Sequence, residues 1–318
     1  MKFVKDIIVA IKGFCMGAAN VVPGVSGGTI ALVSGIYEEL VNALNAVMSP
    51  APWKALFKGD LKGFWKEVHG RFLFWLLIGV AISVFSLAKL VEHELAYHPI
   101  LVWAFFFGLI LASAYYMLHD IKDWKWRDAL ITAAGAVLGL VVCTLSPTTT
   151  PDDAWFIFIC GAIAICTMIL PGISGSFILV ILGKYDYIMS AVSEMNIPVL
   201  IVFALGCAIG ILAFAKFLHW LLGKWERQTM LVLVGFVIGS LIKVWPWNDL
   251  DSCARAQMLR GNLLPEELLE SGSADFALDT LQGMGETLDF QEVGAIIWCF
   301  IGVAVIVLIQ VLSKRTKN

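Results

Sequence analysis

Two related hexapeptides determine how this chain folds: Pro23-Gly24-Val25-Ser26-Gly27-Gly28 near its start and Pro171-Gly172-Ile173-Ser174-Gly175-Ser176 near its middle. They match at an offset of 148 residues, and the match continues through Ile30/Ile178, Gly35/Gly183 and Tyr37/Tyr185. Proline lacks an amide donor and glycine is conformationally loose, so a helix breaks at such a motif. Because each motif lies in a long apolar stretch, the sequence predicts two broken apolar helices.

A second internal match indicates that the whole chain is duplicated. At an offset of 127 residues, Gly79-Val80-Ala81-Ile82 pairs with Gly206-Cys207-Ala208-Ile209, and Ala88-Lys89 pairs with Ala215-Lys216. An insertion within residues 50–71 of the first half explains the change of offset. Chance similarity between apolar helices explains matched Ile and Ala, but it explains a repeated Pro-Gly-x-Ser-Gly and a shared Lys poorly.

Composition places the chain in a membrane. Of its 318 residues, 59% are hydrophobic and 15% are charged, against roughly 25% charged in an average soluble domain. Several uncharged stretches approach or exceed the ~20 residues that a helix needs to cross a bilayer. The formal charge of −3 gives no electrostatic basis for binding nucleic acid. The sequence has no CxxC motif or Cys/His cluster, so we expect no metal and no cofactor.

The distribution of Lys and Arg predicts the topology, because short cytoplasmic loops are enriched in them. Loop 50–71 has five, whereas the loop from Ser146 to Asp153 has none. This arrangement places both termini in the cytoplasm and leaves the two motif segments without a net crossing, so each must be a re-entrant hairpin. The first repeat, 1–146, then holds hairpin 3–49 and spans 72–91, 99–119 and 129–146. The second repeat, 147–318, holds hairpin 154–192, spans 196–222, 229–246 and 292–313, and the extracytoplasmic loop 247–291.

The expected fold class is therefore an all-α polytopic membrane protein with an inverted-topology repeat, each half being one re-entrant helical hairpin plus three transmembrane helices. Such repeats with broken helices are a recurrent design of secondary transporters. Loop 247–291 carries nine acidic and two basic residues. We interpret it as a solvated spacer, with an amphipathic helix over Pro265–Leu281 as the alternative.

The hairpins offer donors for an anion. A non-helical turn at membrane depth persists only where it lines a protein or water-filled cavity. Glycines let backbone amides approach a ligand, hydroxyls add donors, and the helix that follows directs its positive end to the same place. We therefore expect a phosphate or carboxylate to bind between the hairpins, at Ser26, Gly27, Gly28, Thr29, Ser174, Gly175 and Ser176. The alternative is that these small residues only allow tight helix packing.

Five further residues are candidate partners of a substrate headgroup or of a coupling ion. Glu38 and Asp186 follow the matched tyrosines and either cap the hairpins or take up a proton or cation during transport. Lys89 and Lys216 occupy matched positions and either extend to lipid headgroups or receive an anionic headgroup of the substrate. Asn20 precedes the first motif and has no polar counterpart.

The motifs also resemble a known family. The run from Met16 to Ile30, together with Gly35-Ile36-Tyr37-Glu38 and Met168 to Phe177, is similar to the signature of the bacterial polyprenyl-phosphate transporter family, formerly a domain of unknown function. The chain departs from it at Asn20, where Asp is expected, and at Ala112, where Gly is usual. The resemblance implies translocation of undecaprenyl phosphate from the outer to the inner leaflet of the cytoplasmic membrane, where this lipid carrier is recycled for cell-wall glycan synthesis, with no enzymatic activity.

Three other functions remain open from the residues. A secondary transporter of a small soluble anion would use the same donors. An intramembrane lipid phosphatase is a weaker alternative, because it needs a histidine beside a basic cradle and neither hairpin contains a histidine. A structural scaffold would leave the repeated hydroxyls unexplained. The oligomeric state is not predicted.

Overall fold

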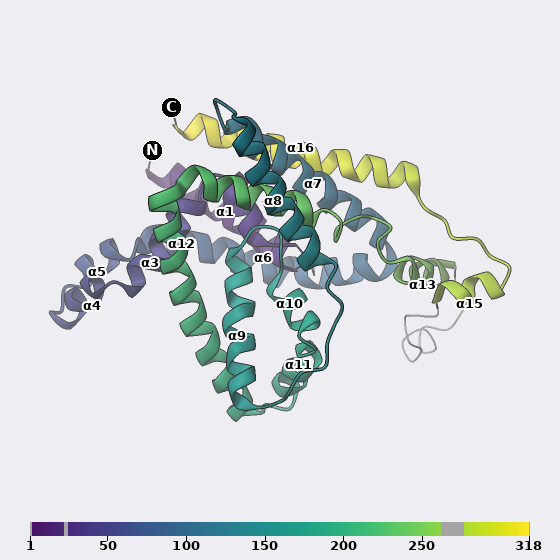
Figure 1. Cartoon of the computed structure of the whole chain (residues 1–318), viewed down its shortest axis with the longest axis horizontal. Helices are drawn as coiled ribbons and strands as arrows, with labels where there is room; N and C mark the ends of the chain where they lie inside the picture. Colours follow the sequence, from purple (N-terminus) through teal and green to yellow (C-terminus); the bar gives the residue numbers. More distant parts are fainter. Residues whose placement is uncertain (1, 22–24, 262–276, 318) are drawn as a thin grey trace.

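The computed structural model describes residues 2–21, 25–261 and 277–317, and within these ranges every regular element is a helix (Figure 1). In chain order the helices are α1 (Lys2–Val21), α2 (Gly27–Val33), α3 (Tyr37–Met48), α4 (Pro50–Phe57), α5 (Leu61–Glu67), α6 (Gly70–Tyr97), α7 (Pro99–Asp120), α8 (Trp126–Cys143), α9 (Ala154–Ile169), α10 (Gly175–Ile181), α11 (Tyr185–Ser193), α12 (Ile197–Ser240), α13 (Leu250–Gly261), α15 (Ala277–Gly283) and α16 (Glu292–Lys317).

Five of these helices, α6, α7, α8, α12 and α16, are long and apolar enough to cross a membrane. Two further pairs pass the same test but are sharply bent: α2 with α3 by 117° and α10 with α11 by 112°. The expected class is thus confirmed as an all-helical, multi-pass membrane protein. The bends occur in the two segments where the sequence predicts re-entrant hairpins. That these segments enter and leave the membrane on the same side stays a prediction.

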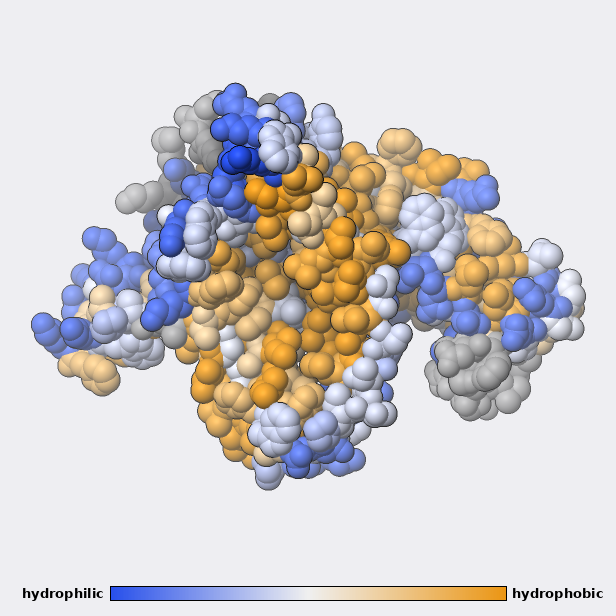
Figure 2. Space-filling model, in the orientation of Figure 1, coloured by the Kyte–Doolittle hydropathy of each residue, from blue (hydrophilic) through white to orange (hydrophobic). Residues whose placement is uncertain are grey.

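Large apolar side chains cover the outside of the helices. Phe85 of α6 is 89% exposed and Phe300 of α16 is 69% exposed. Figure 2 shows hydrophobic residues extending over most of the visible central face, with hydrophilic residues gathered at the ends of the molecule. An exposed apolar surface of this extent is unfavourable in water and favourable in lipid. The surface therefore agrees with the span assignment.

Glycines allow the main helix pairs to pack at backbone distance. A Cβ atom on Gly79 of α6 would lie 2.0 Å from the carbonyl oxygen of Ala10 in α1, and one on Gly206 of α12 would lie 2.0 Å from that of Phe158 in α9. Small residues at such interfaces are the usual means of helix association in membranes. The α1–α6 and α9–α12 pairs are therefore built in the same way, with glycines that match at the 127-residue offset.

The remaining two pairs join the halves of the chain. Gly108 of α7 faces Cys299 of α16 at 2.0 Å, and Gly235 of α12 faces Thr132 of α8 at 2.1 Å, again measured from an added Cβ to the carbonyl oxygen. In Figure 1, α7 runs beside α16, the last helix of the chain. Each half therefore packs its late helices against the other half.

Helix α12 is divided by a break at Trp225. The sequence predicts two spans, 196–222 and 229–246, and two helices meet at Trp225 within Ile197–Ser240. Trp225 has non-helical dihedrals, φ −137° and ψ 50°, and lies in the gap between the two predicted spans. The helix ends before residue 246 because turns follow at 241–244 and Pro246 disfavours helical geometry in the residue before it.

The long hydrophilic loop is partly folded. Helices α13 and α15 share a small core of Ala254, Met258, Ala277 and Leu281. Cys253 of α13 packs with Ile100 and Ala104 of α7, which attaches this helical cap to the membrane-spanning part. The interpretation of the loop as a solvated spacer is therefore wrong for α13 and α15, because their apolar faces are buried. Most of the alternative helix, residues 265–276, lies outside the described residues.

Candidate functional site

The break after α1 is organised by Asn20 and Ser26. The side-chain oxygen of Asn20 accepts the amide of Gly27 at 2.7 Å, and Ser26 Oγ accepts the amide of Gly28 at 3.1 Å as the cap of α2. Ser26 and Thr29 are buried, at 1% and 0% exposure. Asn20 therefore holds the first break in shape, a role that requires an amide or acid oxygen. Pro23 and Gly24 of the motif lie outside the described residues.

The break after α9 places two hydroxyls side by side. Gly172 has a φ of +93°, which L-residues with a side chain rarely adopt, so the turn requires glycine here. Ser174 Oγ lies 2.7 Å from Ser176 Oγ, and within the described residues neither hydroxyl makes another hydrogen bond. Gly175 begins α10 close to α9, with an added Cβ 2.6 Å from the carbonyl oxygen of Ala164.

The two breaks contact each other directly. Ser26 Oγ donates to the carbonyl oxygen of Leu170 at 2.9 Å, and the amide of Gly172 donates to Thr29 Oγ1 at 2.9 Å. A Cβ on Gly28 would lie 2.4 Å from the carbonyl oxygen of Ile169, so the backbones touch. The structure therefore brings residues of both predicted hairpins together. In this arrangement the hydroxyls of Ser26 and Thr29 are bonded to the second break. A ligand could reach them only if the two breaks, which we call the tips of the predicted hairpins, moved apart.

The other candidates lie away from this contact. Glu38 and Asp186 are exposed residues in the first turns of α3 and α11, and neither helix has a side-chain cap. Lys89 and Lys216 are exposed on α6 and α12. Within the described residues, no hydrogen bond or ion pair joins either lysine to the tips. Whether any of these four residues takes part in transport stays a prediction.

A further buried charge that the sequence did not predict is Lys184, in the turn after α10. This lysine is buried at 4% exposure, and its Nζ donates to the carbonyl oxygen of Thr150 and pairs with Asp152, both at 2.7 Å. Thr148 and Thr150 also bond the end of α10. Residues 148–152 are thus tied across the turn of the second hairpin. The sequence feature that could have indicated Lys184 is its position directly after Gly183, at the end of an apolar segment, where the first motif segment has Ile36.

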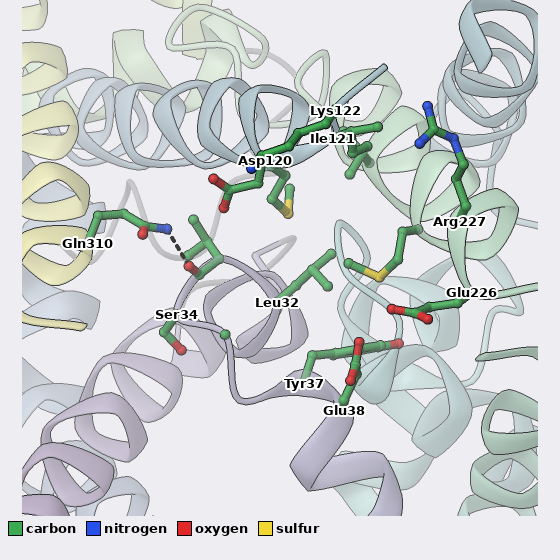
Figure 3. Close-up of a pocket in the computed structure, with 15 residues that line it drawn as sticks. Leu32, Ser34, Tyr37, Glu38, Asp120, Ile121, Lys122, Glu226, Arg227 and Gln310 are labelled. Carbon is green, nitrogen blue, oxygen red and sulfur yellow. Dashed lines mark hydrogen bonds between the residues drawn. The ribbon is translucent and has the colours of Figure 1, made fainter. Parts of the chain in front are cut away.

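A polar cavity of about 730 Å³ opens at the turn of the first hairpin (Figure 3). Its charged lining comes from α3, the end of α7, the segment that follows α7, and α12: Glu38, Asp120, Lys122, Glu226 and Arg227. Tyr37 also lines it; this residue is 2% exposed, and its hydroxyl has no hydrogen-bond partner among the described residues. The two hairpin turns therefore differ: the first borders an open polar cavity, and the second is covered by residues 148–152.

A second cavity, of about 710 Å³, is almost entirely apolar. It lies between α1, α6, α7 and α16, and it reaches Ala18, Ala19 and Ile30 beside the first break. Phe14, Leu90, Phe105, Phe106 and Trp298 provide much of its wall, and Glu94 and His98 are among its few polar residues. Such a cavity fits a hydrocarbon chain and offers little to a small hydrated anion.

Comparison with known proteins gives concordant results. A family model described as undecaprenyl phosphate translocase-like matches residues 16–260. A polyprenyl-phosphate transporter of Vibrio cholerae serotype O1 is 41% identical over 263 residues, which cover 81% of this chain and 85% of that protein. A polyprenyl-phosphate transporter of Staphylococcus aureus is 32% identical over 255 residues, covering 74% and 85%. No solved structure matches the chain.

Proposed function

The chain belongs to the undecaprenyl phosphate translocase-like family, and from that premise we propose that it moves a polyprenyl phosphate across the bacterial cytoplasmic membrane. The direction we propose is from the outer to the inner leaflet, which would return undecaprenyl phosphate to cell-wall glycan synthesis. The single observation that supports a lipid substrate is the apolar cavity beside the first break, because its apolar wall can bind a hydrocarbon chain but offers no favourable contact to a soluble anion. We assign the chain no catalytic role.

The phosphate binds, in this proposal, at the two tips. Ser26, Gly27, Gly28 and Thr29 on one side and Ser174, Gly175 and Ser176 on the other provide hydroxyls and amides. The Ser174–Ser176 pair supports the idea, because two hydroxyls that bind only each other within the described residues retain one proton to donate. Separation of the tips would release the donors of Ser26 and Thr29 as well.

The prenyl tail remains in an apolar environment throughout. Its first units would occupy the cavity between α1, α6, α7 and α16, whose inner end lies beside Ile30, one turn after Ser26. The rest of the tail would extend into lipid. Holding the headgroup inside the protein and the tail outside avoids moving a charge through hydrocarbon, which is the costly step in crossing a bilayer.

We propose an inverted-topology repeat as the basis of the exchange between leaflets. Repeat 1–146 with hairpin 3–49 and repeat 147–318 with hairpin 154–192 would enter from opposite faces, with both termini in the cytoplasm. The matched helix pairs α1–α6 and α9–α12 support the duplication. The open cavity at one hairpin turn and the covered turn at the other support a state accessible from one side.

Transport by the purified chain tests the proposal. Proteoliposomes containing labelled undecaprenyl phosphate should move the lipid between leaflets faster than protein-free liposomes, and Ser26→Ala with Ser174→Ala should slow the movement. Rapid movement of undecaprenol alone would contradict headgroup recognition. Uptake of inorganic phosphate without lipid movement would favour a soluble-anion transporter, and release of phosphate from the lipid would favour a phosphatase.

A further inference from the structure

Lys243 is a charged residue in an unexpected place. It lies in the turn of residues 241–244 that follows α12. The predicted topology puts this turn at the extracytoplasmic end of span 229–246, where the positive-inside bias does not favour lysine, and charged residues within a membrane span are rare. None of the three ion pairs formed within the described residues includes it. A lysine at this location therefore needs a physical reason other than pairing or the usual charge bias.

The side chain of Lys243 is directed at the second hairpin. Its Nζ lies 4.7 Å from the centre of the Phe177 ring, in α10. The face of an aromatic ring attracts and orients an ammonium group without neutralising its charge. The contact thus holds a positive charge, half-buried, beside the segment that starts with the Ser174–Ser176 hydroxyl pair.

The backbone fixes this lysine relative to the tip. The amide of Lys243 donates to the carbonyl oxygen of Ser240 at 3.0 Å, which closes the turn. Ser240 in turn packs on Gly172, where an added Cβ would lie 2.8 Å from Ser240 Oγ. Contacts therefore run without a gap from Gly172 through Ser240 and Lys243 to Phe177, which directly follows Ser176 in the chain. The ammonium group therefore lies on the ring of the residue next to Ser176, on the side of the second break that carries the hydroxyl pair.

We propose that Lys243, Ser174 and Ser176 form a binding site for a phosphate monoester at the second hairpin, with Lys243 supplying the charge. One hydroxyl proton of the serine pair remains free to donate, and the ammonium group has three donors. A phosphate oxygen offers strong acceptors for both, and charge-assisted bonds of this kind are the stronger ones. The choice of a prenyl phosphate as the source of the monoester rests on the proposed function; inorganic phosphate shares the same chemistry.

Binding to the full-length protein in nanodiscs of neutral lipid tests this site. The ligands are undecaprenyl phosphate, undecaprenol as the uncharged analogue, and inorganic phosphate as a competitor. Lys243→Gln should weaken binding of the lipid phosphate by about tenfold to a hundredfold, the range for loss of one charged hydrogen bond. Binding of undecaprenol should not change, and Lys243→Arg should retain most of the affinity.

Lys224→Gln is the matched control. Lys224 also lies over aromatic rings, 4.5 Å from the centre of Trp225, and also makes no ion pair within the described residues. It lies just before the break at Trp225, however, whereas Lys243 follows the end of α12 at Ser240. It should bind undecaprenyl phosphate as the wild type does. Equal affinities of the Lys243→Gln and Lys224→Gln variants would overturn the site. Should Lys243→Gln fold poorly, Lys243→Met provides the same comparison, measured as the rise in melting temperature that undecaprenyl phosphate causes in the variant and in the wild type.

The outcomes separate this inference from the proposed function. If the wild type binds undecaprenyl phosphate and Lys243→Gln binds it equally well, the site is wrong and the function stands. If the wild type binds undecaprenol and undecaprenyl phosphate equally, headgroup recognition fails and both are wrong. Competition by inorganic phosphate in the wild type that is lost in Lys243→Gln would show that the site recognises the phosphate group itself.

Discussion

Replacing Thr29 by valine tests the contact between the two breaks. Thr29 Oγ1 accepts the amide of Gly172 at 2.9 Å, and Thr29 is 0% exposed. Valine keeps the shape and removes the acceptor, so that the amide of Gly172 is left buried and unpaired. Leaving a buried donor unsatisfied costs about 1–3 kcal/mol, whereas hydrogen bonds between membrane helices average about 0.6 and reach about 1.7 kcal/mol.

We expect Thr29→Val to lower the free energy of unfolding by about 1–2 kcal/mol, because the tight turn at Gly172 gives its amide no other acceptor. Reversible unfolding of the purified protein in mixed micelles measures this. Thr29→Ser, which keeps the hydroxyl, should cost less. Ser83→Ala is the matched control, since Ser83 Oγ is fully buried and has no hydrogen-bond partner in the part of the chain that the structure describes.

Two results would refute the reasoning. If Thr29→Val is as stable as the wild type, the contact between the breaks contributes nothing. If Ser83→Ala destabilises as much as Thr29→Val, the effect reflects loss of a buried hydroxyl in general and not this hydrogen bond.

Three more predictions follow from contacts elsewhere in the chain. Gly108→Ala puts a methyl group 2.0 Å from the Cys299 carbonyl oxygen and should reduce the yield of folded protein on size-exclusion chromatography. Gly223→Ala, where no atom of the described residues lies within 4 Å of the added methyl group, should leave the yield unchanged. Lys184→Met removes the ion pair with Asp152; a cysteine placed at Thr148 should then react faster with an impermeant maleimide, and an unchanged rate would show that the segment is held by other contacts. Burial, and secondarily Asp249, raises the pKa of the Cys253 thiol to about 12, so at pH 7–9 it stays protonated and should label far more slowly in folded than in unfolded protein; rapid labelling of the folded state would contradict its burial against α7.

The sequence predicted the helix breaks well because proline and glycine act locally. Helix α9 ends at Ile169, just before Pro171, and α10 begins at Gly175. The glycines matched at the 127-residue offset also mark helix contacts, since Gly79 and Gly206 both lie where two helices pack at backbone distance. Matched small residues in apolar helices therefore indicated where helices pack.

The contacts between distant segments were not predictable in the same way. No spacing rule indicates that Ser26 bonds Leu170, because that bond depends on how both halves pack. The break at Trp225 lies in the gap that the sequence leaves between spans 196–222 and 229–246, but Lys224, Glu226 and Arg227 are helical where the sequence predicts a polar loop. Lys184 was missed because a lysine at the end of an apolar segment usually reaches solvent, whereas here it is buried against residues 148–152.

The packing of α7 on α16 constrains the order in which the protein can be made. Helix α7 is inserted long before the ribosome reaches α16, so its glycine-lined face, including Gly108, must wait in the bilayer without its final neighbour. During that interval lipid, or an insertion factor, covers the face. Truncations that end before α16 should therefore leave an early helix unpaired, and the fold can close only after α16 has been inserted.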